Sequence, residues 1–326
     1  MRRGRAARAT ALIRRENSMN NYDRHLAAIL AAAFIGIAAQ PSNAAIPTSA
    51  AVAARIDLAK ARSLPASSAA IDCLFATVPE LGRGGGLLAQ NFGIDPRRDI
   101  SSIEAWADGF TYDGESLALL DASTLARGKF DEARMASSVR SSRGFRRALA
   151  GDREIMTADF ARGHWIAFPA SGTMLVSSSQ AAVAKAIGAL SRGAGGAAPS
   201  TFLEKSVSID CPAVAAIDGT RGARNLSLFT GGLIAADAET LCAKITEANP
   251  GTAVLEITMA FADEKTATQV FATINGIKML ASIQEARGKS VHALMRRFIE
   301  SRLACRGATV QLEMSVTKAD IAELTK

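Results

Sequence analysis

The sequence predicts an α+β fold with mostly antiparallel sheets, helices packed on one face, and two related halves. Three observations lead to this prediction. Segments in which polar and apolar residues alternate recur along the chain, as expected for half-buried strands. Amphipathic helical segments lie between them. The order of these elements is loosely similar before and after a Gly/Ala-rich stretch at residues 191–200.

The chain opens with a segment typical of a secretory leader. Seven arginines lie between Arg2 and Arg24, and an almost wholly apolar run extends from Leu26 to Ala39. Small residues occupy the last and third-last positions before Ala45, as a signal-peptide cleavage site requires. The apolar run is shorter than the roughly 20 residues that span a bilayer. We therefore expect residues 1–44 to be a signal peptide and the mature protein to be periplasmic or secreted.

The charge of the chain resides mostly in this leader. The net charge is +7, and the leader contributes +5 of it through seven arginines and two acids, which leaves +2 on the mature chain. Aromatic residues for stacking bases are missing from its basic patches, so we expect no nucleic-acid partner. No second apolar segment reaches membrane-spanning length, so we expect no transmembrane segment in the mature chain. Translation can start at Met1 or at Met19, because Met19 also begins a compact leader. A start at Met19 would leave 18 residues untranslated.

Residues 45–190 form the expected N-terminal half, and residues 191–200 have the composition of a linker. Asp113-Gly114 is a hairpin signal between two apolar runs. Asp131 is expected to cap a helix that runs to about Ser142. The expected strands are 52–58, 103–110, 117–121, 125–130, 153–160, 164–169 and 173–178, and the other expected helices are 71–78, 81–92 and 181–190.

Residues 201–326 form the expected C-terminal half. Asn249-Pro250-Gly251 is a turn by composition, so the flanking runs 241–246 and 253–261 should form an antiparallel pair. Asp263 should cap a long helix with one apolar face, made of Val270, Phe271, Ile274, Ile277 and Leu280. The remaining expected elements are strands at 212–218 and 310–316, and helices at 225–230, 291–298 and 318–324.

The most specific local motif is Asp95-Pro96-Arg97-Arg98-Asp99-Ile100. An Asp-Pro turn fixes the backbone, and Asp99 is placed to pair with one of the arginines. A phosphate or carboxylate can instead bind to two adjacent guanidinium groups. Arg97 and Arg98 are therefore the candidate site for an anionic ligand, weighed against a rigid turn with solvated charges.

The sequence carries no signature of a catalytic, cofactor or metal site. Gly82-Arg83-Gly84-Gly85-Gly86 lacks the Gly-Lys-Ser/Thr ending of a phosphate loop. No Gly-x-Ser-x-Gly motif occurs, and the histidines and cysteines lack the spacing of metal ligands. We therefore expect no catalytic residues, no cofactor and no metal.

The mature chain contains four cysteines, Cys73, Cys211, Cys242 and Cys305. An oxidising compartment would allow two disulfides in three pairings, whereas cysteine is also a common small core residue. Buried thiols and disulfides both remain open. If one bridge forms, we expect it between Cys211 and Cys242, because both lie in expected strands of the same half.

Five stretches resemble a known group of proteins in their order along the chain. They are FGIDPRRDISSIEAW, LARGKFDEARM, TMLVSSSQAAVAKAI, MAFADEKTATQVFATINGIKML and VQLEMSVTKADIAEL. This order resembles uncharacterised exported bacterial proteins from planctomycete- and verrucomicrobia-like genomes. The resemblance spans most of the mature chain and implies a fold and an exported location. It implies no activity and no catalytic residues.

These features predict an exported protein with a non-enzymatic binding or structural role in the cell envelope. Its partner would be an unidentified protein or small molecule. The alternative is an exported hydrolase that acts on an envelope polymer through carboxylates brought together by folding. Paired acids can perform such hydrolysis without a sequence motif.

Overall fold

The computed structural model describes residues 46–47, 49–77, 93–112, 117–129, 131–161, 163–193, 201–222, 238–287 and 293–323. These residues form an α+β fold with a large antiparallel sheet, which confirms the predicted class. The expected helices at 81–92 and 225–230 and most of the expected linker, residues 194–200, lie outside the described residues. None of the described helices combines the length and the apolarity that a bilayer crossing needs.

The N-terminal half contains most of the predicted elements. Asp131 caps its helix as predicted, because its carboxylate accepts a hydrogen bond from the backbone N–H of Arg134 at 2.9 Å. The elements are β1 (Val52–Asp57), α2 (Leu58–Ser63), α3 (Pro65–Thr77), α5 (Pro96–Asp99), β2 (Ile100–Ala107), β3 (Gly109–Tyr112), β4 (Leu117–Leu120), β5 (Ser123–Gly128), α6 (Glu132–Ser141), β6 (Arg146–Ala150), β7 (Arg153–Thr157), η1 (Asp159–Ala161), β8 (Trp165–Ala170), β9 (Thr173–Ser177) and α7 (Gln180–Gly193).

The described C-terminal half also contains most of the predicted elements. Asp263 caps the long helix by accepting from the backbone N–H of Thr266 at 2.8 Å, and the two strands around Pro250 pair antiparallel. The elements are α8 (Phe202–Val207), β10 (Ala213–Asp218), α9 (Gly219–Gly222), β11 (Thr240–Asn249), β12 (Thr252–Ala260), α11 (Glu264–Ala286), α12 (Ala293–Glu300), β13 (Arg302–Arg306), β14 (Thr309–Thr317) and α13 (Lys318–Glu323).

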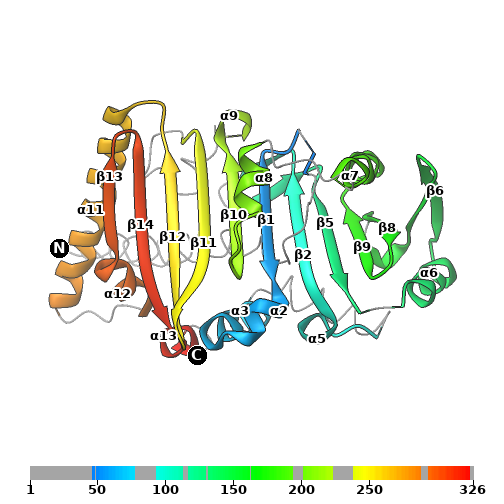
Figure 1. Ribbon diagram of the computed structural model, residues 1–326, viewed down its shortest axis with the longest axis horizontal. Helices are drawn as coiled ribbons and strands as arrows, with labels where there is room; N and C mark the ends of the chain where they lie inside the picture. Colours follow the sequence, from blue (N-terminus) through cyan, green and yellow to red (C-terminus); the bar gives the residue numbers. More distant parts are fainter. Residues whose placement is uncertain are drawn as a thin grey trace, which may run out of the picture.

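Both halves contribute to one continuous sheet. Among the described residues it has twelve strands in the order β13-β14-β12-β11-β10-β1-β2-β5-β9-β8-β7-β6, all paired antiparallel where the register is given (Figure 1). The halves meet at β1 and β10, where Ala54 pairs with Ala215. A separate two-stranded sheet joins β3 to β4.

The two halves follow the same strand order. Outward from the centre, the N-terminal half runs β1-β2-β5-β9-β8 and the C-terminal half runs β10-β11-β12-β14-β13. In each half the third strand is followed by a helix, α6 or α11, before the chain returns at the edge. The hairpin β6–β7 extends the N-terminal half beyond this shared plan. The topology therefore agrees with the expectation of two related halves.

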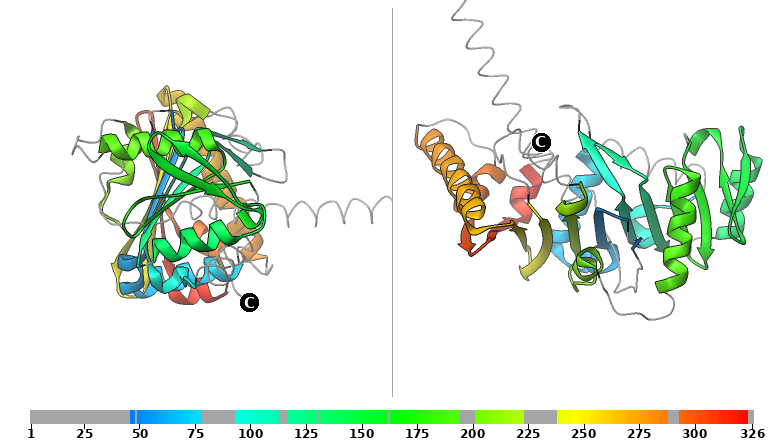
Figure 2. Two further views of the ribbon diagram at one scale, coloured as in Figure 1. Left: turned by 90° about the vertical axis from the view of Figure 1, so that its right-hand side faces the viewer. Right: turned by 90° about the horizontal axis from the view of Figure 1, so that it is seen from above.

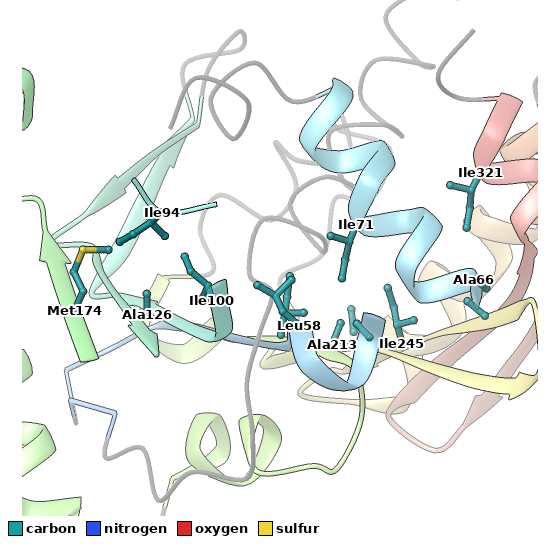
Figure 3. Close-up of a cluster of buried hydrophobic side chains, with 14 of the residues drawn as sticks. Leu58, Ala66, Ile71, Ile94, Ile100, Ala126, Met174, Ala213, Ile245 and Ile321 are labelled. Atoms are coloured by element: carbon teal, nitrogen blue, oxygen red, sulfur yellow. The ribbon is translucent and has the colours of Figure 1, made fainter. Parts of the chain in front are cut away.

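One face of the sheet is covered along most of its length. Ile56, Ala126, Met174, Ala213 and Ile245 point to this face from five different strands and belong to one buried cluster. Figure 3 shows this cluster extending beneath α2 and α3 toward Ile321 of α13. At the far end, α11 and α12 pack on the same face through a smaller cluster.

The prediction that all helices share one face is wrong for α7 and α8. The neighbours of the residues above in each strand point to the opposite face, and there Leu125, Leu175 and Val214 are buried in a second cluster. α7 contacts β5, β8 and β9, whereas α8 contacts β1 and β10. The central strands are apolar on both sides, so both faces require a cover.

Two edge elements were absent from the sequence prediction. β6 carries Arg146 and Arg147, and β13 begins and ends with Arg302 and Arg306. Charged residues are common on edge strands, where they discourage pairing with other chains. They also interrupt the alternation of polar and apolar residues that reveals a strand, which explains why the sequence did not predict these two strands.

Candidate functional site

The two arginines proposed to bind an anion lie on α5, a single helical turn. Asp95 caps this turn by accepting from the backbone N–H of Arg97 at 3.0 Å. Arg98 Nε lies 3.1 Å from Asp99 Oδ1, and this hydrogen bond raises the pKa of Arg98 and lowers the pKa of Asp99. Arg97 Nη1 lies 3.8 Å from Asp72 Oδ1. Both exposed arginines thus face carboxylates, and an anion at this site would compete with them.

A different arginine, Arg62, holds this turn in place. Its guanidinium donates to the carbonyl oxygens of Arg97 at 2.7 Å, Arg98 at 2.9 Å and Ile100 at 2.6 Å. Its Nε also donates to the carbonyl oxygen of Leu58 at 2.8 Å. Arg62 therefore links α2 to the entry of β2. The sequence gives no signal for this role, because the contacts are to backbone oxygens about 35 residues away.

The structure does not contain the expected bridge between Cys211 and Cys242. Both are free thiols. The Cys211 thiol is buried and donates to the carbonyl oxygen of Ala213 at 3.2 Å. Burial raises the pKa of both thiols, which favours the protonated, unreactive form. Both cysteines act here as small core residues, the other explanation left open by the sequence.

Three charged side chains lie on the neighbouring strands β1, β2 and β5, and two of them, Arg55 and Glu104, are buried. Arg55 on β1 is 1% exposed and lies directly across from Glu104 on β2. Glu104 accepts a hydrogen bond from Arg127 on β5. Arg55 Nη2 donates to the carbonyl oxygens of Ile209 at 2.5 Å and Cys211 at 3.2 Å.

This group has a structural role in the described part of the protein. The hydrogen bonds of Arg55 hold residues 209–211, which follow α8, against β1 at the centre of the sheet. Its Nε and Nη1 atoms are buried without a hydrogen-bond partner among the described residues. Leaving a buried charge short of partners costs several kcal/mol, so the surrounding packing must supply the stability that keeps this arrangement.

A second polar cluster brings two carboxylates together. Lys185 of α7 contacts both Asp108, which follows β2, and Asp121, which precedes β5, with the Asp121 carboxylate 3.4 Å from its Nζ. Ser179 and Ser49 also donate to these carboxylates, at 3.1 and 2.8 Å. The hydrogen bond to Asp108 raises the pKa of Lys185, so the ammonium stays charged between the two acids. This arrangement is better suited to holding α7 against the sheet than to acid–base catalysis.

Three exposed large apolar side chains of the described residues lie on α11, the helix next to β13 at one end of the molecule (Figures 1 and 2). The inner face of α11 is buried, as predicted, at Val270 and Ile274. Leu280 was assigned to this inner face, and that prediction is wrong: Leu280 is 62% exposed. At 3.6 residues per turn, Leu280 lies about 120° around the helix from Ile274.

Leu280 belongs to a second, outer apolar face of α11. Its neighbours are Met279, which is 62% exposed, and Ile283, which is 40% exposed. One turn before them lies Gly276, where an added Cβ would meet no atom within 4 Å. A glycine within a helix costs about 1 kcal/mol relative to alanine, and no contact within the described structure accounts for it. The outer face thus carries large apolar side chains at its C-terminal end and has no side chain at Gly276, one turn earlier.

The charges nearest this outer face are already engaged elsewhere. Lys278 turns inward and donates to the carbonyl oxygen of Ser301, and burial lowers its pKa. Glu285 accepts from Arg296 of α12 at 3.0 Å. The surface between residues 276 and 283 therefore presents apolar side chains without a competing charge. The spacing of Gly276, Met279 and Ile283 was the sequence signal for this face, and it was hidden by the stronger inner stripe.

Comparisons with known proteins give little beyond these observations. No known protein family matches the chain, and no curated protein matches it. Among solved structures, crystal form I of TP0453 aligns with 88% of this chain and 96% of that chain, at 9% sequence identity and a TM-score of 0.46. None of these comparisons assigns an activity to the chain.

Proposed function

We propose that this chain is an exported envelope protein that binds a protein partner through the outer face of α11 and has no catalytic role. The observation that carries the binding proposal is the exposure of Met279 and Leu280, each 62%, on two adjacent positions of a well-formed helix. Contiguous exposed apolar patches mark protein interaction sites, and Ile283, 40% exposed, extends this pair along the helix. The polar clusters of the described structure have internal partners, so they offer less to a ligand.

Export is the part of the proposal that the leader supports. Seven arginines, an apolar run and a small-residue cleavage site precede Ala45. Mass spectrometry of the protein purified from its own cells tests this directly. We expect a mature chain that begins at Ala45. A full-length mass would contradict export. The basic N-terminus would then have a function other than targeting.

The binding surface is tested by photo-crosslinking inside the producing cells. A photoreactive amino acid replaces Leu280 in one variant and Leu149 in the control. Leu149 is also highly exposed, at 68%, but lies on β6 at the opposite end of the sheet (Figure 1). We expect a protein adduct of one defined mass from position 280 and none from position 149.

A second substitution makes this experiment specific for the apolar face. With the photoreactive residue still at position 280, Met279→Glu places a charge in the middle of the face. The adduct should then disappear, because burying an unpaired carboxylate is costly. An adduct that survives Met279→Glu, or the absence of any protein adduct from position 280, would contradict the proposed function.

A further inference from the structure

Arg55 on β1 is an exception to the internal pairing of charges in this protein. It is 1% exposed and makes no ion pair with a carboxylate of the described residues. Two neighbouring cations are paired, Arg127 with Glu104 and Lys60 with Asp210 at 2.7 Å. Together these side chains carry three positive and two negative charges, and the charge of Arg55 is the one that is not balanced. Buried charges in proteins are normally paired, so this region is short of one anion.

The guanidinium of Arg55 also has unused hydrogen-bonding capacity. Its Nη2 donates to the carbonyl oxygens of Ile209 at 2.5 Å and Cys211 at 3.2 Å, whereas Nε and Nη1 are buried without an acceptor in the described structure. Buried polar groups are nearly always hydrogen-bonded, so an exception calls for an explanation. The paired N–H groups of a guanidinium match the two oxygens of a carboxylate. A carboxylate would supply both the missing charge and the missing acceptors.

A short loop at the surface, residues 208–212, covers this guanidinium. The loop joins α8 to β10, and its residues Ile209 and Asp210 are 37% and 76% exposed. Solvent does not reach the Arg55 nitrogen atoms Nε and Nη1 in this arrangement, so a ligand can reach them only when a covering segment moves. Outward movement of the loop exposes Arg55 and Cys211, while α8 keeps its own buried side chains as an anchor.

We propose that Arg55 is the recognition residue of a closed binding site for a carboxylate ligand. In the closed form, the carbonyl oxygens of Ile209 and Cys211 occupy the guanidinium. When the loop moves outward, the guanidinium exchanges these oxygens for the two oxygens of the carboxylate. One carboxylate brings a single negative charge and balances Arg55, whereas a phosphate group carries up to about two. The site is separate from the outer face of α11 and does not depend on the protein partner proposed for that face.

The thiol of Cys211 is a natural reporter of loop opening. It is 1% exposed in the closed loop, so iodoacetamide reaches it only after opening. Peptide mass spectrometry of the mature chain measures its labelling rate in sodium acetate and in sodium chloride of equal concentration and pH. A ligand of the open form raises the open population by the factor 1 + [L]/Kd. Acetate at about 0.2 M, with a Kd of about 0.1 M, should therefore raise the rate about threefold. Cys305 on the edge strand β13 is the internal control and should show no acetate effect.

Two variants test whether Arg55 is responsible. Arg55→Gln removes the positive charge, so the rates in acetate and in chloride should become equal. The control Lys60→Met removes the cation that pairs with Asp210 of the same loop and should leave the ratio of the two rates as in the wild type. Circular dichroism verifies that each variant is folded. Acetamide, a neutral molecule of the same shape as acetate, provides a test on the wild type alone and should not raise the rate.

The outcomes are distinct. Equal rates in acetate and chloride for the wild type would overturn the proposal, as would an acetate effect that persists in Arg55→Gln or that acetamide reproduces. The source of the carboxylate is distinguished with N-acetyl-triglycine and its C-terminal amide. A rise with the free acid but not with the amide supports the site and shows that the end of a polypeptide enters it. A rise with acetate but not with N-acetyl-triglycine supports the site and restricts the ligand to small organic acids.

Discussion

Side chains that contact backbone oxygens hold several critical points of this protein. Arg62 is the clearest example, because one guanidinium donates to three carbonyl oxygens around α5 and to a fourth in its own helix. Two of these acceptors are the carbonyl oxygens of Arg97 and Arg98, the arginines of the Asp95–Ile100 motif. Arg62, which no sequence motif marks, therefore positions the two arginines that the motif does mark.

Replacing Arg62 should therefore cost more stability than replacing either arginine of the motif. We expect Arg62→Ala to lower the free energy of unfolding by about 2–4 kcal/mol, because several charge-assisted hydrogen bonds are lost together. The control Arg98→Ala removes a side chain that is 78% exposed and should cost much less, because solvent screens its ion pair. Urea unfolding of the three proteins measures both values. Equal losses in the two variants would contradict the role given to Arg62.

Asp320 is a second residue whose contacts have a measurable consequence. Burial alone would raise its pKa, but hydrogen bonds from Arg297 at 2.8 Å and from Thr317 outweigh burial and lower the pKa. A carboxyl with a lowered pKa stabilises the fold above its unfolded pKa of about 3.9, and this stabilisation is lost as the pH falls through the folded pKa.

Asp320→Asn should consequently destabilise the protein by about 1–2 kcal/mol at pH 7 and progressively less below about pH 4. Urea midpoints of the wild type and the variant across this range test the prediction. Asp152→Asn, at a carboxylate that is 91% exposed, serves as the control and should show a much smaller difference. A loss from Asp320→Asn that is independent of pH would show that charge is not the cause.

The residue scale is also where the sequence was least informative. Caps such as Asp131 and Asp263 are local, and their side chains reach only three residues along the chain, so they were predicted correctly. Arg55, Glu104 and Arg62 act over long sequence separations, and nothing local marks them. Leu280 was misplaced because the inner stripe of α11 was assumed to continue unchanged to the end of the helix.

At the scale of elements, the irregular pairing of β2 with β5 is a close junction between backbones. The register shifts between Ile100 and Ser102, and the backbone of Asp99 passes directly over Gly128. A Cβ at position 128 would lie 2.2 Å from the carbonyl oxygen of Asp99. Gly172 adds to this junction, because its carbonyl oxygen accepts a hydrogen bond from the backbone N–H of Gly128 at 2.9 Å.

Gly128→Ala should destabilise the fold by about 3 kcal/mol or more, because the contact is with backbone that cannot move aside cheaply. Gly109→Ala is the matched control: it is also a strand glycine, and its added Cβ would meet only Leu120 Cδ1 at 3.6 Å, an ordinary contact. We expect the control to change stability by less than about 1 kcal/mol. Thermal and urea unfolding of both variants distinguish a steric cause from a general effect of replacing glycine in a strand.

The predicted elements show where sequence patterns work and where they stop. β14 was found because apolar and polar residues alternate in it, with one face solvent-exposed at Gln311, Glu313 and Ser315. β11 and β12 were found because the turn at Asn249-Pro250-Gly251 separates two strand-like runs. β6 and β13 were missed because arginines interrupt the pattern. α7 was placed on the wrong face, and α8 was not predicted, because alternation cannot tell which strands are buried on both sides.

At the scale of the whole molecule, the two halves form a single structural unit. β1 and β10 pair along five residues at the centre of the sheet. Glu247 at the end of β11 adds a second link, since it accepts from Ser67 Oγ at 3.3 Å in the other half and from the backbone N–H of Gly251 at 2.8 Å in its own. The sequence suggested two halves but could not show that they share one sheet, because strand pairing between distant segments leaves no local pattern.

The protein should accordingly unfold in one cooperative transition. Both tryptophans, Trp106 and Trp165, lie in the N-terminal half, so their fluorescence reports that half alone, whereas far-ultraviolet circular dichroism reports both. We expect the two signals to give the same urea midpoint, because unfolding of either half leaves the central strand of the other without one of its two partner strands. Separate midpoints would show that the halves unfold independently and that their shared sheet contributes little.

The pairing of β1 also fixes an order of events during synthesis. Ala54 pairs with Ala105 of β2, about 50 residues later, and with Ala215 of β10, about 160 residues later. During synthesis, β2 can therefore pair with one edge of β1 long before β10 is available for the other edge. Until β10 is synthesised, β1 has an unpaired edge whose backbone N–H and C=O groups can pair with other chains, although β1 lies at the centre of the finished sheet. Chains truncated before residue 213 should keep this unpaired edge and aggregate through it.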